Sequence, residues 1–136
     1  MFRLISKYKI LKENHLVIQY HEGIMNLNNY INFAKTLYSD VNYSPNLNHI
    51  IHIENVKLKA SFENLNTYAE FSEKKFKKPK NRNIAVITKT PNQIVIATLF
   101  KMLGRVTSQS VEIFSTSKAA EEWLEIDINT LQEVLK

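Results

Sequence analysis

Apolar and polar residues alternate near the N-terminus in the manner of β-strands. Residues 8–11 and 16–21 are rich in apolar side chains, and the four residues between them are mainly polar. Two such runs joined by a short polar stretch predict a β-hairpin. In the second run, Leu16, Ile18 and Tyr20 alternate with Val17, Gln19 and His21. We expect Gly23 to end this strand.

Further along, apolar residues recur every three or four positions, which is typical of helices with one buried face. The spacing predicts a helix over 27–38 that is capped by Asn26, and a second helix that begins at Ser61 and ends before Pro79. A third helix begins at Pro91 and runs to about Leu103. Thr90 and Gly104 are expected to cap this third helix. A fourth helix is predicted from Ser117 to Leu124, and a short helix is predicted near the C-terminus.

Compact apolar runs at 49–53, 84–88 and 111–114 predict three more strands, each followed by a predicted helix. Strands that alternate with helices indicate parallel β-α-β units with right-handed crossovers. If the strands are arranged in sequence order, all crossover helices cover one face of the sheet and the other face stays open. The polar residues expected on that open face are Gln19, His21, His52 and Glu112. The expected fold class is therefore α/β, with a mixed, mostly parallel five-stranded sheet and helices mainly on one face.

Chain length and composition fit one globular domain over residues 1–136. The chain has 44% hydrophobic and 23% charged residues, which are values of folded proteins. It has no cysteine, which excludes disulfides, thiolate metal sites and a cysteine nucleophile. No apolar run approaches the roughly 18 residues that span a bilayer, and the N-terminus lacks the pattern of a signal peptide. We expect a cytoplasmic protein without a transmembrane segment.

The layout of these segments resembles the SpoIIAA-like family of STAS/Sec14-type domains. The resemblance rests on the initial hairpin and on segments 46–53, 84–87, 96–102, 111–116 and 119–124, and it covers residues 4–125. It implies a bacterial protein with a mixed five-stranded sheet. Anti-sigma-factor antagonists that are related to this family are switched by phosphorylation of a serine at the start of the second helix, and Sec14-type relatives bind lipids.

Ser61 lies where that regulatory serine would fall, just after the third predicted strand. The start of a helix favours a phosphate, because its free backbone amides point outward. The antagonists, however, carry an Asp-Ser pair followed by Ser and Gly, whereas Ser61 stands between Ala60 and Phe62, and Glu63 would repel a phosphate. We therefore interpret Ser61 as an ordinary N-cap and leave its phosphorylation open.

The net charge of +5 comes from one short segment. Six of the 18 basic residues lie between Lys74 and Arg82, and the other 12 are balanced by 13 acidic residues. Only Phe76 interrupts this segment with an aromatic ring, so it offers no stacking platform and nucleic acid is disfavoured as a partner. We interpret the segment as a solvated helix end and turn.

No metal, cofactor or catalytic site is predicted. His49 and His52 point to opposite faces of a strand, and although His21 and His52 could meet on the open face, no carboxylate at a fixed spacing completes a metal site. The sequence has no nucleophile elbow and no glycine-rich phosphate loop. If a polar ligand binds, we expect it at the carboxyl edge of the sheet, bordered by Ser61, Lys89, Thr90 and Asn92.

The third predicted helix is the most unusual segment, because it is apolar on almost all sides. Only Thr98 and Lys101 interrupt the run from Ile94 to Leu103. Such a helix is deeply buried, forms a subunit contact or lines an apolar pocket, and these three alternatives stay open. Candidate interface residues are Val95, Leu99, Phe100 and Met102. We expect a homodimeric, non-catalytic regulatory or protein-interaction module. The alternative is a lipid-binding or small-molecule-binding domain with an apolar pocket near residues 91–103, and an enzyme is disfavoured.

Overall fold

The computed structural model describes residues 3–59, 67, 70, 82–104 and 109–126. These residues form a mixed sheet of five strands in the order β1-β2-β3-β4-β5. The strands are β1 (Leu4–Leu11), β2 (Leu16–Asn26), β3 (Asn48–Lys59), β4 (Arg82–Ile87) and β5 (Gln109–Phe114). β1 pairs with β2 antiparallel, whereas the pairs from β2 to β5 are parallel. This confirms the expected fold class and the sequential strand order.

Three helices of the described residues pack on this sheet: α1 (Leu27–Tyr38), α3 (Pro91–Gly104) and α4 (Ser117–Leu124). A short 3-10 turn, η1 (Lys12–Asn14), joins β1 to β2. Asn26 caps α1 as expected, through a hydrogen bond that its side chain accepts from the backbone N–H of Asn29. Thr116, rather than Ser117, caps α4 by accepting from the N–H of Ala119. The second predicted helix and the C-terminal helix lie outside the described residues, apart from Thr67 and Glu70, which are both helical.

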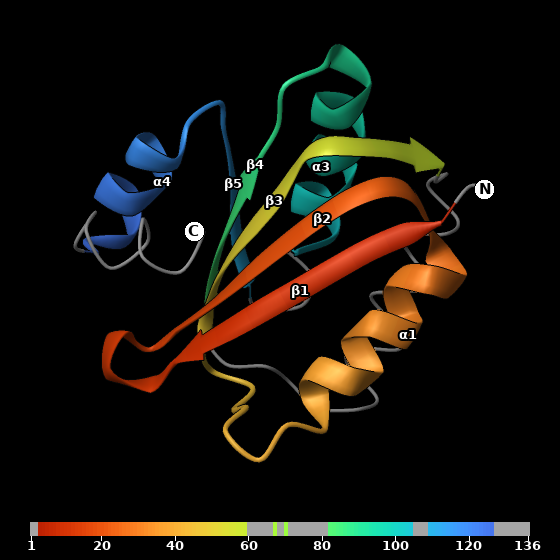
Figure 1. Ribbon diagram of the computed structural model, residues 1–136. Coiled ribbons are helices and arrows are strands. Elements are labelled where there is room, and N and C mark those ends of the chain that lie inside the picture. The colour runs from red at the N-terminus through yellow and green to blue at the C-terminus, as the bar shows by residue number, and fades with distance from the viewer. Residues whose placement is uncertain (1–2, 60–66, 68–69, 71–81, 105–108, 127–136) are drawn as a thin grey trace.

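The helices lie on both faces of the sheet (Figure 1). α1 and α3, which are crossover helices, lie on one face, as right-handed connections between sequential strands require. α4 follows the last strand and returns over the opposite face. The face that was expected to be open is therefore covered by α4 at the β4–β5 end.

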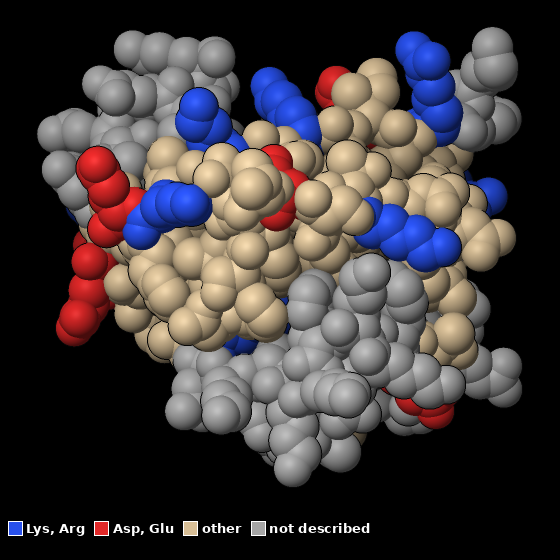
Figure 2. Space-filling view, turned by 90° about the horizontal axis from the view of Figure 1, so that it is seen from below, with Lys and Arg blue, Asp and Glu red and all other residues tan. Residues whose placement is uncertain are grey.

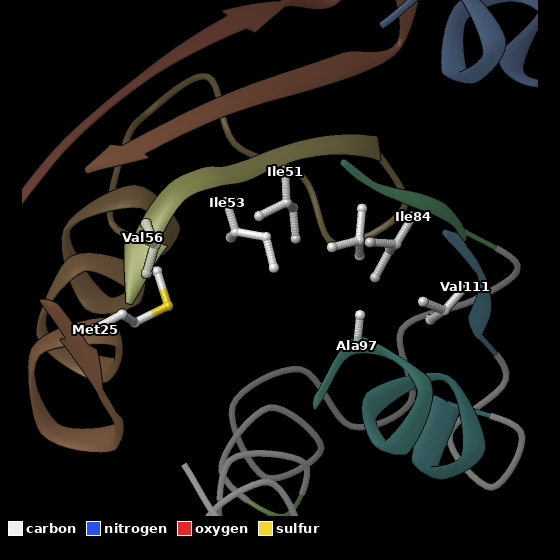
Figure 3. Close-up of a cluster of buried hydrophobic side chains, with 8 residues drawn as sticks. Met25, Ile51, Ile53, Val56, Ile84, Ala97 and Val111 are labelled. Carbon is white, nitrogen blue, oxygen red and sulfur yellow. The ribbon is translucent and has the colours of Figure 1, made fainter. Parts of the chain in front are cut away.

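The main core lies between the sheet and α3. Side chains from the four parallel strands point toward Ala97 of the helix (Figure 3). This cluster consists of Met25, Ile51, Ile53, Val56, Ile84, Val86, Ala97 and Val111. On the opposite face, Ala120 of α4 packs with a second cluster made of Leu16, Ile18, Ile50, Ala85 and Ile87. Two-sided burial explains why the strands read as nearly continuous apolar runs.

β2 and β3 are longer than the sequence pattern indicated. Gly23 does not end β2, because it pairs with Leu4 on one side and with Val56 on the other. Its φ of +103° is open to glycine but strained for other residues, and a Cβ there would lie 2.1 Å from the carbonyl oxygen of Arg3. The glycine is thus a close-approach position within a strand rather than a strand terminator.

Candidate functional site

Four strands contribute polar side chains to a buried row beneath α1. Nε2 of His21 donates to Oε1 of Gln19 at 2.9 Å, and Nε2 of Gln19 donates to Nδ1 of His49 at 3.1 Å. The neutral ring of His21 can then accept at Nδ1, which lies 2.6 Å from the hydroxyl of Ser6. Nη1 of Arg82 lies 3.5 Å from Nε2 of His49. We call Ser6, Gln19, His21, His49 and Arg82 the polar row.

Aromatic side chains close the polar row on the side away from the sheet. The hydroxyl of Tyr30 in α1 donates to Oε1 of Gln19 at 3.0 Å, and the ring of Phe33 lies edge-on to His21 with centroids 4.7 Å apart. Nη1 of Arg82 donates to the hydroxyl of Tyr43 at 3.0 Å. His21 is fully buried and Arg82 is 3% exposed. Burial lowers the pKa of His21 to about 4, with a smaller contribution from the charge of His52.

This burial corrects two interpretations of the sequence. Gln19 and His21 do not lie on an open face, because α1 covers both side chains. His21 does not meet His52, because the two rings point to opposite sides of the sheet. Arg82 is not part of a solvated turn but a buried residue of β4, and the lysines at 74–80 lie outside the described residues. Alternating polar residues predict an exposed face, whereas here these side chains form hydrogen bonds with one another inside the protein.

The candidate ligand residues Lys89, Thr90 and Asn92 are brought together at the turn between β4 and α3. Gln93 organises this turn, since its Oε1 accepts from the backbone N–H groups of Lys89 at 2.7 Å and Thr90 at 3.0 Å. Nδ2 of Asn92 donates to the carbonyl of Leu58 at 3.5 Å. Two amides that could bind an anion therefore already donate to Gln93. A ligand role for this turn stays a prediction, and Ser61 lies outside the described residues.

The interface candidates on α3 differ in exposure. Val95 and Met102 are 57% and 52% exposed, and Ile94, which is not among the candidates predicted from the sequence, is 46% exposed. Leu99 and Phe100 are half-buried, and Phe100 packs against the main core. The exposed apolar face of α3 thus consists of Ile94, Val95 and Met102, and hydrophobic periodicity alone could not separate it from the buried face.

On the face seen from below, charged side chains are dispersed. The end of the molecule seen in Figure 2 has a broad uncharged area, with Lys, Arg, Asp and Glu side chains at separate points around and within it. Among the described residues, no group of three or more His, Asp or Glu side chains could hold a metal ion. No helix in that part of the chain is long and apolar enough to cross a membrane.

Comparison with known proteins identifies the fold. No protein-family model matches the chain, and no curated protein sequence matches it. A solved structure of an uncharacterised protein from Shewanella loihica, of the DUF3478 family and with a SpoIIAA-like fold, superposes with a TM-score of 0.57. The match covers 91% of this chain and 95% of that chain at 12% sequence identity. The chain therefore has a SpoIIAA-like fold, as the resemblance in sequence layout implied.

Proposed function

We propose that the chain is a non-catalytic interaction module that forms a symmetric homodimer through α3. The observation that carries this proposal is the exposed apolar face of α3. Three of the five large hydrophobic side chains exposed in the described residues belong to this one helix, namely Ile94, Val95 and Met102. A contiguous apolar patch of this kind is typical of a contact surface.

The order of residues along α3 fits a second copy of the same helix. Ile94, Thr98 and Met102 are spaced by four residues and so form one row. The hydroxyl of Thr98 donates to the carbonyl of Ile94 at 2.7 Å, which leaves its methyl group for contact. In an antiparallel two-fold pairing, the small Thr98 lies at the crossing point and Ile94 faces Met102 of the partner subunit. A symmetric contact needs only one such self-complementary surface.

Charge also favours a copy of the chain over a charged partner. Lys101 is the one charged residue of α3, and its Nζ lies 3.1 Å from Oε2 of Glu112 within the same chain. The face is therefore neutral, so two copies approach without repulsion. The cytoplasmic location and the regulatory role expected from the sequence belong to this proposal and remain predictions.

Sedimentation of the full chain at micromolar concentration tests the proposal. We expect a dimer, and we expect Val95→Glu to weaken its association at least about 100-fold, because an unpaired charge buried in an apolar contact costs about 3–5 kcal/mol. Val41→Glu is the matched control, since Val41 is an exposed hydrophobic residue (92%) outside α3.

Two results would overturn the assignment. A wild-type monomer would exclude the dimer, and an acyl chain that copurifies with it in a native mass spectrum would favour the lipid-binding alternative. A dimer that Val95→Glu leaves intact would place the contact elsewhere on the molecule.

A further inference from the structure

β1 is an edge strand, with β2 on one side and no strand of the described residues on the other (Figure 1). The backbone N–H of Ile24 donates to the carbonyl of Arg3 at 3.2 Å, and β1 continues from there in an unbroken antiparallel register. Because alternate residues of such a strand point their backbone groups to the same side, the even-numbered residues from Leu4 to Ile10 point theirs away from the sheet. These donors and acceptors are a template for a further strand.

The side chains of β1 alternate between two environments. The even-numbered ones are half-buried, and those of Leu4, Tyr8 and Ile10 pack against apolar clusters on the face that α1 and α3 cover. The odd-numbered side chains from Ile5 to Lys9 are exposed on the other face. A strand added to this edge therefore meets apolar groups on one face of the sheet and lysines on the other.

The edge carries positive charge that is not neutralised nearby. Residues 3–12 contain four exposed cations, Arg3, Lys7, Lys9 and Lys12, and no acidic residue. Within the described residues, no carboxylate forms an ion pair with the three cations at 3, 7 and 9. Nζ of Lys7 lies 5.2 Å from the centroid of the Tyr20 ring, a contact with a neutral group that leaves its charge in place. The charge of this edge is thus complementary to an acidic strand.

The same charges disfavour a second copy of the chain as the added strand. Lysines on an edge strand discourage the pairing of identical strands. In the two-fold antiparallel pairing that aligns Leu4 with Ile10, Lys7 lies directly opposite Lys7 of the partner subunit, and like charges in that position are destabilising. An acidic segment of a different protein is attracted by the same lysines.

We propose that β1 binds an extended, acidic segment of a partner protein, which adds a strand to the edge of the sheet. Backbone hydrogen bonds supply the affinity, and alternate side chains supply the specificity. The segment carries acidic residues two positions apart, beside Lys7 and Lys9, and apolar residues between them, beside Tyr8 and its even-numbered neighbours. This site is additional to the proposed dimer contact, because α3 packs against β3 and β5, and each subunit keeps its own β1 edge.

Fluorescence polarisation of a labelled peptide, titrated with the full chain, tests the proposal. The probe is a peptide of alternating glutamate and valine with eight residues, the length of β1. We expect saturable binding of one peptide per chain, and weaker binding of the matched peptide of alternating lysine and valine. A glutamate–valine peptide that binds no more tightly than the lysine–valine peptide would overturn the proposal.

N-methyl groups on the peptide separate strand pairing from attraction between charges. In an added strand, one alternate set of N–H groups points toward β1 and the other set points to solvent. Methylation of the valine nitrogens and methylation of the glutamate nitrogens should therefore have unequal effects, with a loss of affinity of at least about tenfold for one set and within about threefold for the other. Loss on valine methylation indicates an antiparallel strand, and loss on glutamate methylation indicates a parallel one.

Charge reversal on the protein locates the contact. Lys7→Glu combined with Lys9→Glu should weaken binding of the glutamate–valine peptide at least about tenfold, because attraction becomes repulsion at two positions. Lys57→Glu combined with Lys59→Glu is the matched control. Those exposed lysines are also two positions apart on a strand, but side chains of α3 already donate to backbone carbonyls at that end of β3. The control should bind the peptide as the wild type does.

Two further results would overturn the proposal. Equal effects of the two methylated peptides would show a contact that depends on charge alone, of the kind a nucleic acid also makes. Binding that the variant at 7 and 9 retains, or that the control loses to the same extent, would place the contact elsewhere on the molecule. A monomeric chain that binds the peptide at β1 would refute the dimer and support this inference, so the two proposals can fail separately.

Discussion

Each polar side chain of the polar row finds its partner inside the protein, and this sets how the fold responds to acid. His21 and His49 are buried in their neutral forms. Burial lowers the pKa of His21 to about 4, and burial together with the nearby charge of Arg82 lowers the pKa of His49 well below its ordinary value. Protons therefore bind these rings more readily in the unfolded chain than in the folded one.

We expect the free energy of unfolding to fall as the pH is lowered from 6.5 toward 4. The loss assigned to His21 reaches about 3 kcal/mol, since one pKa unit corresponds to about 1.4 kcal/mol. Denaturant unfolding of wild type and His21→Gln at several pH values measures it. The variant lacks this titration, so its stability should depend less steeply on pH in that window. Parallel curves for the two proteins would contradict the assignment.

Single residues were also where prediction from the sequence was weakest. The pattern placed Gln19 and His21 on an open face because partners such as Tyr30 and Ser6 are distant in sequence and carry no local signal. The same limit applies to the hydrogen bond between His52 and Glu54. The β-bulge at this point is a shift in the register between β2 and β3 that no periodicity reveals.

At the scale of elements, the start of α3 is hydrogen-bonded both to the β4–α3 turn and to β3. Gln93 accepts from the backbone of the β4–α3 turn through its oxygen and donates to β3 through its nitrogen. Thr90 completes the cap, since its hydroxyl accepts from the N–H of Gln93 at 3.3 Å. The sequence predicted Thr90 and Pro91 at this helix start, because capping is local. It did not predict that Gln93 reaches β3.

We expect Gln93→Ala to destabilise the protein by about 2–4 kcal/mol, because several backbone groups at a buried site lose their partner at once and each costs about 1–3 kcal/mol. Asn92→Ala is the neighbouring control. Its side chain is exposed and makes one long bond of 3.5 Å, so the loss should stay within about 0.5 kcal/mol. Chemical denaturation of both variants measures the difference, and equal losses would refute the role assigned to Gln93.

For the whole molecule, the strand order and the side of the crossover helices could be predicted, because chain connectivity and handedness leave few arrangements. The face on which α4 packs could not be predicted, because the handedness rule applies only to a helix that connects two strands, and α4 follows the last strand. Apolar contacts determine the face on which α4 packs. Ala120 is fully buried, and the rings of Trp123 and Phe114 have centroids 5.6 Å apart. The second face is thus apolar under α4 and polar around His52.

The unequal strand lengths predict unequal protection within β3. Residues 49–52 pair with both β2 and β4, whereas residues 55–59 pair in the described structure with β2 alone. We expect backbone amides at 49–52 to exchange with solvent at least about tenfold more slowly than those at 57–59. Hydrogen exchange followed by mass spectrometry measures the two segments in one experiment. Uniform protection along β3 would show that the far end is held by contacts other than pairing with β4.

The polar row also bears on how the chain avoids errors while it folds. A strand displaced by one residue sends all its side chains to the other side of the sheet. For β2 or β3 this would carry Gln19, His21 or His49 into the apolar cluster beneath α4, where each unpaired group costs about 1–3 kcal/mol. Strand pairings in the wrong register are therefore unstable and dissociate. The hydrogen bonds of the polar row form only in the native register, and they thus select this register while the sheet assembles.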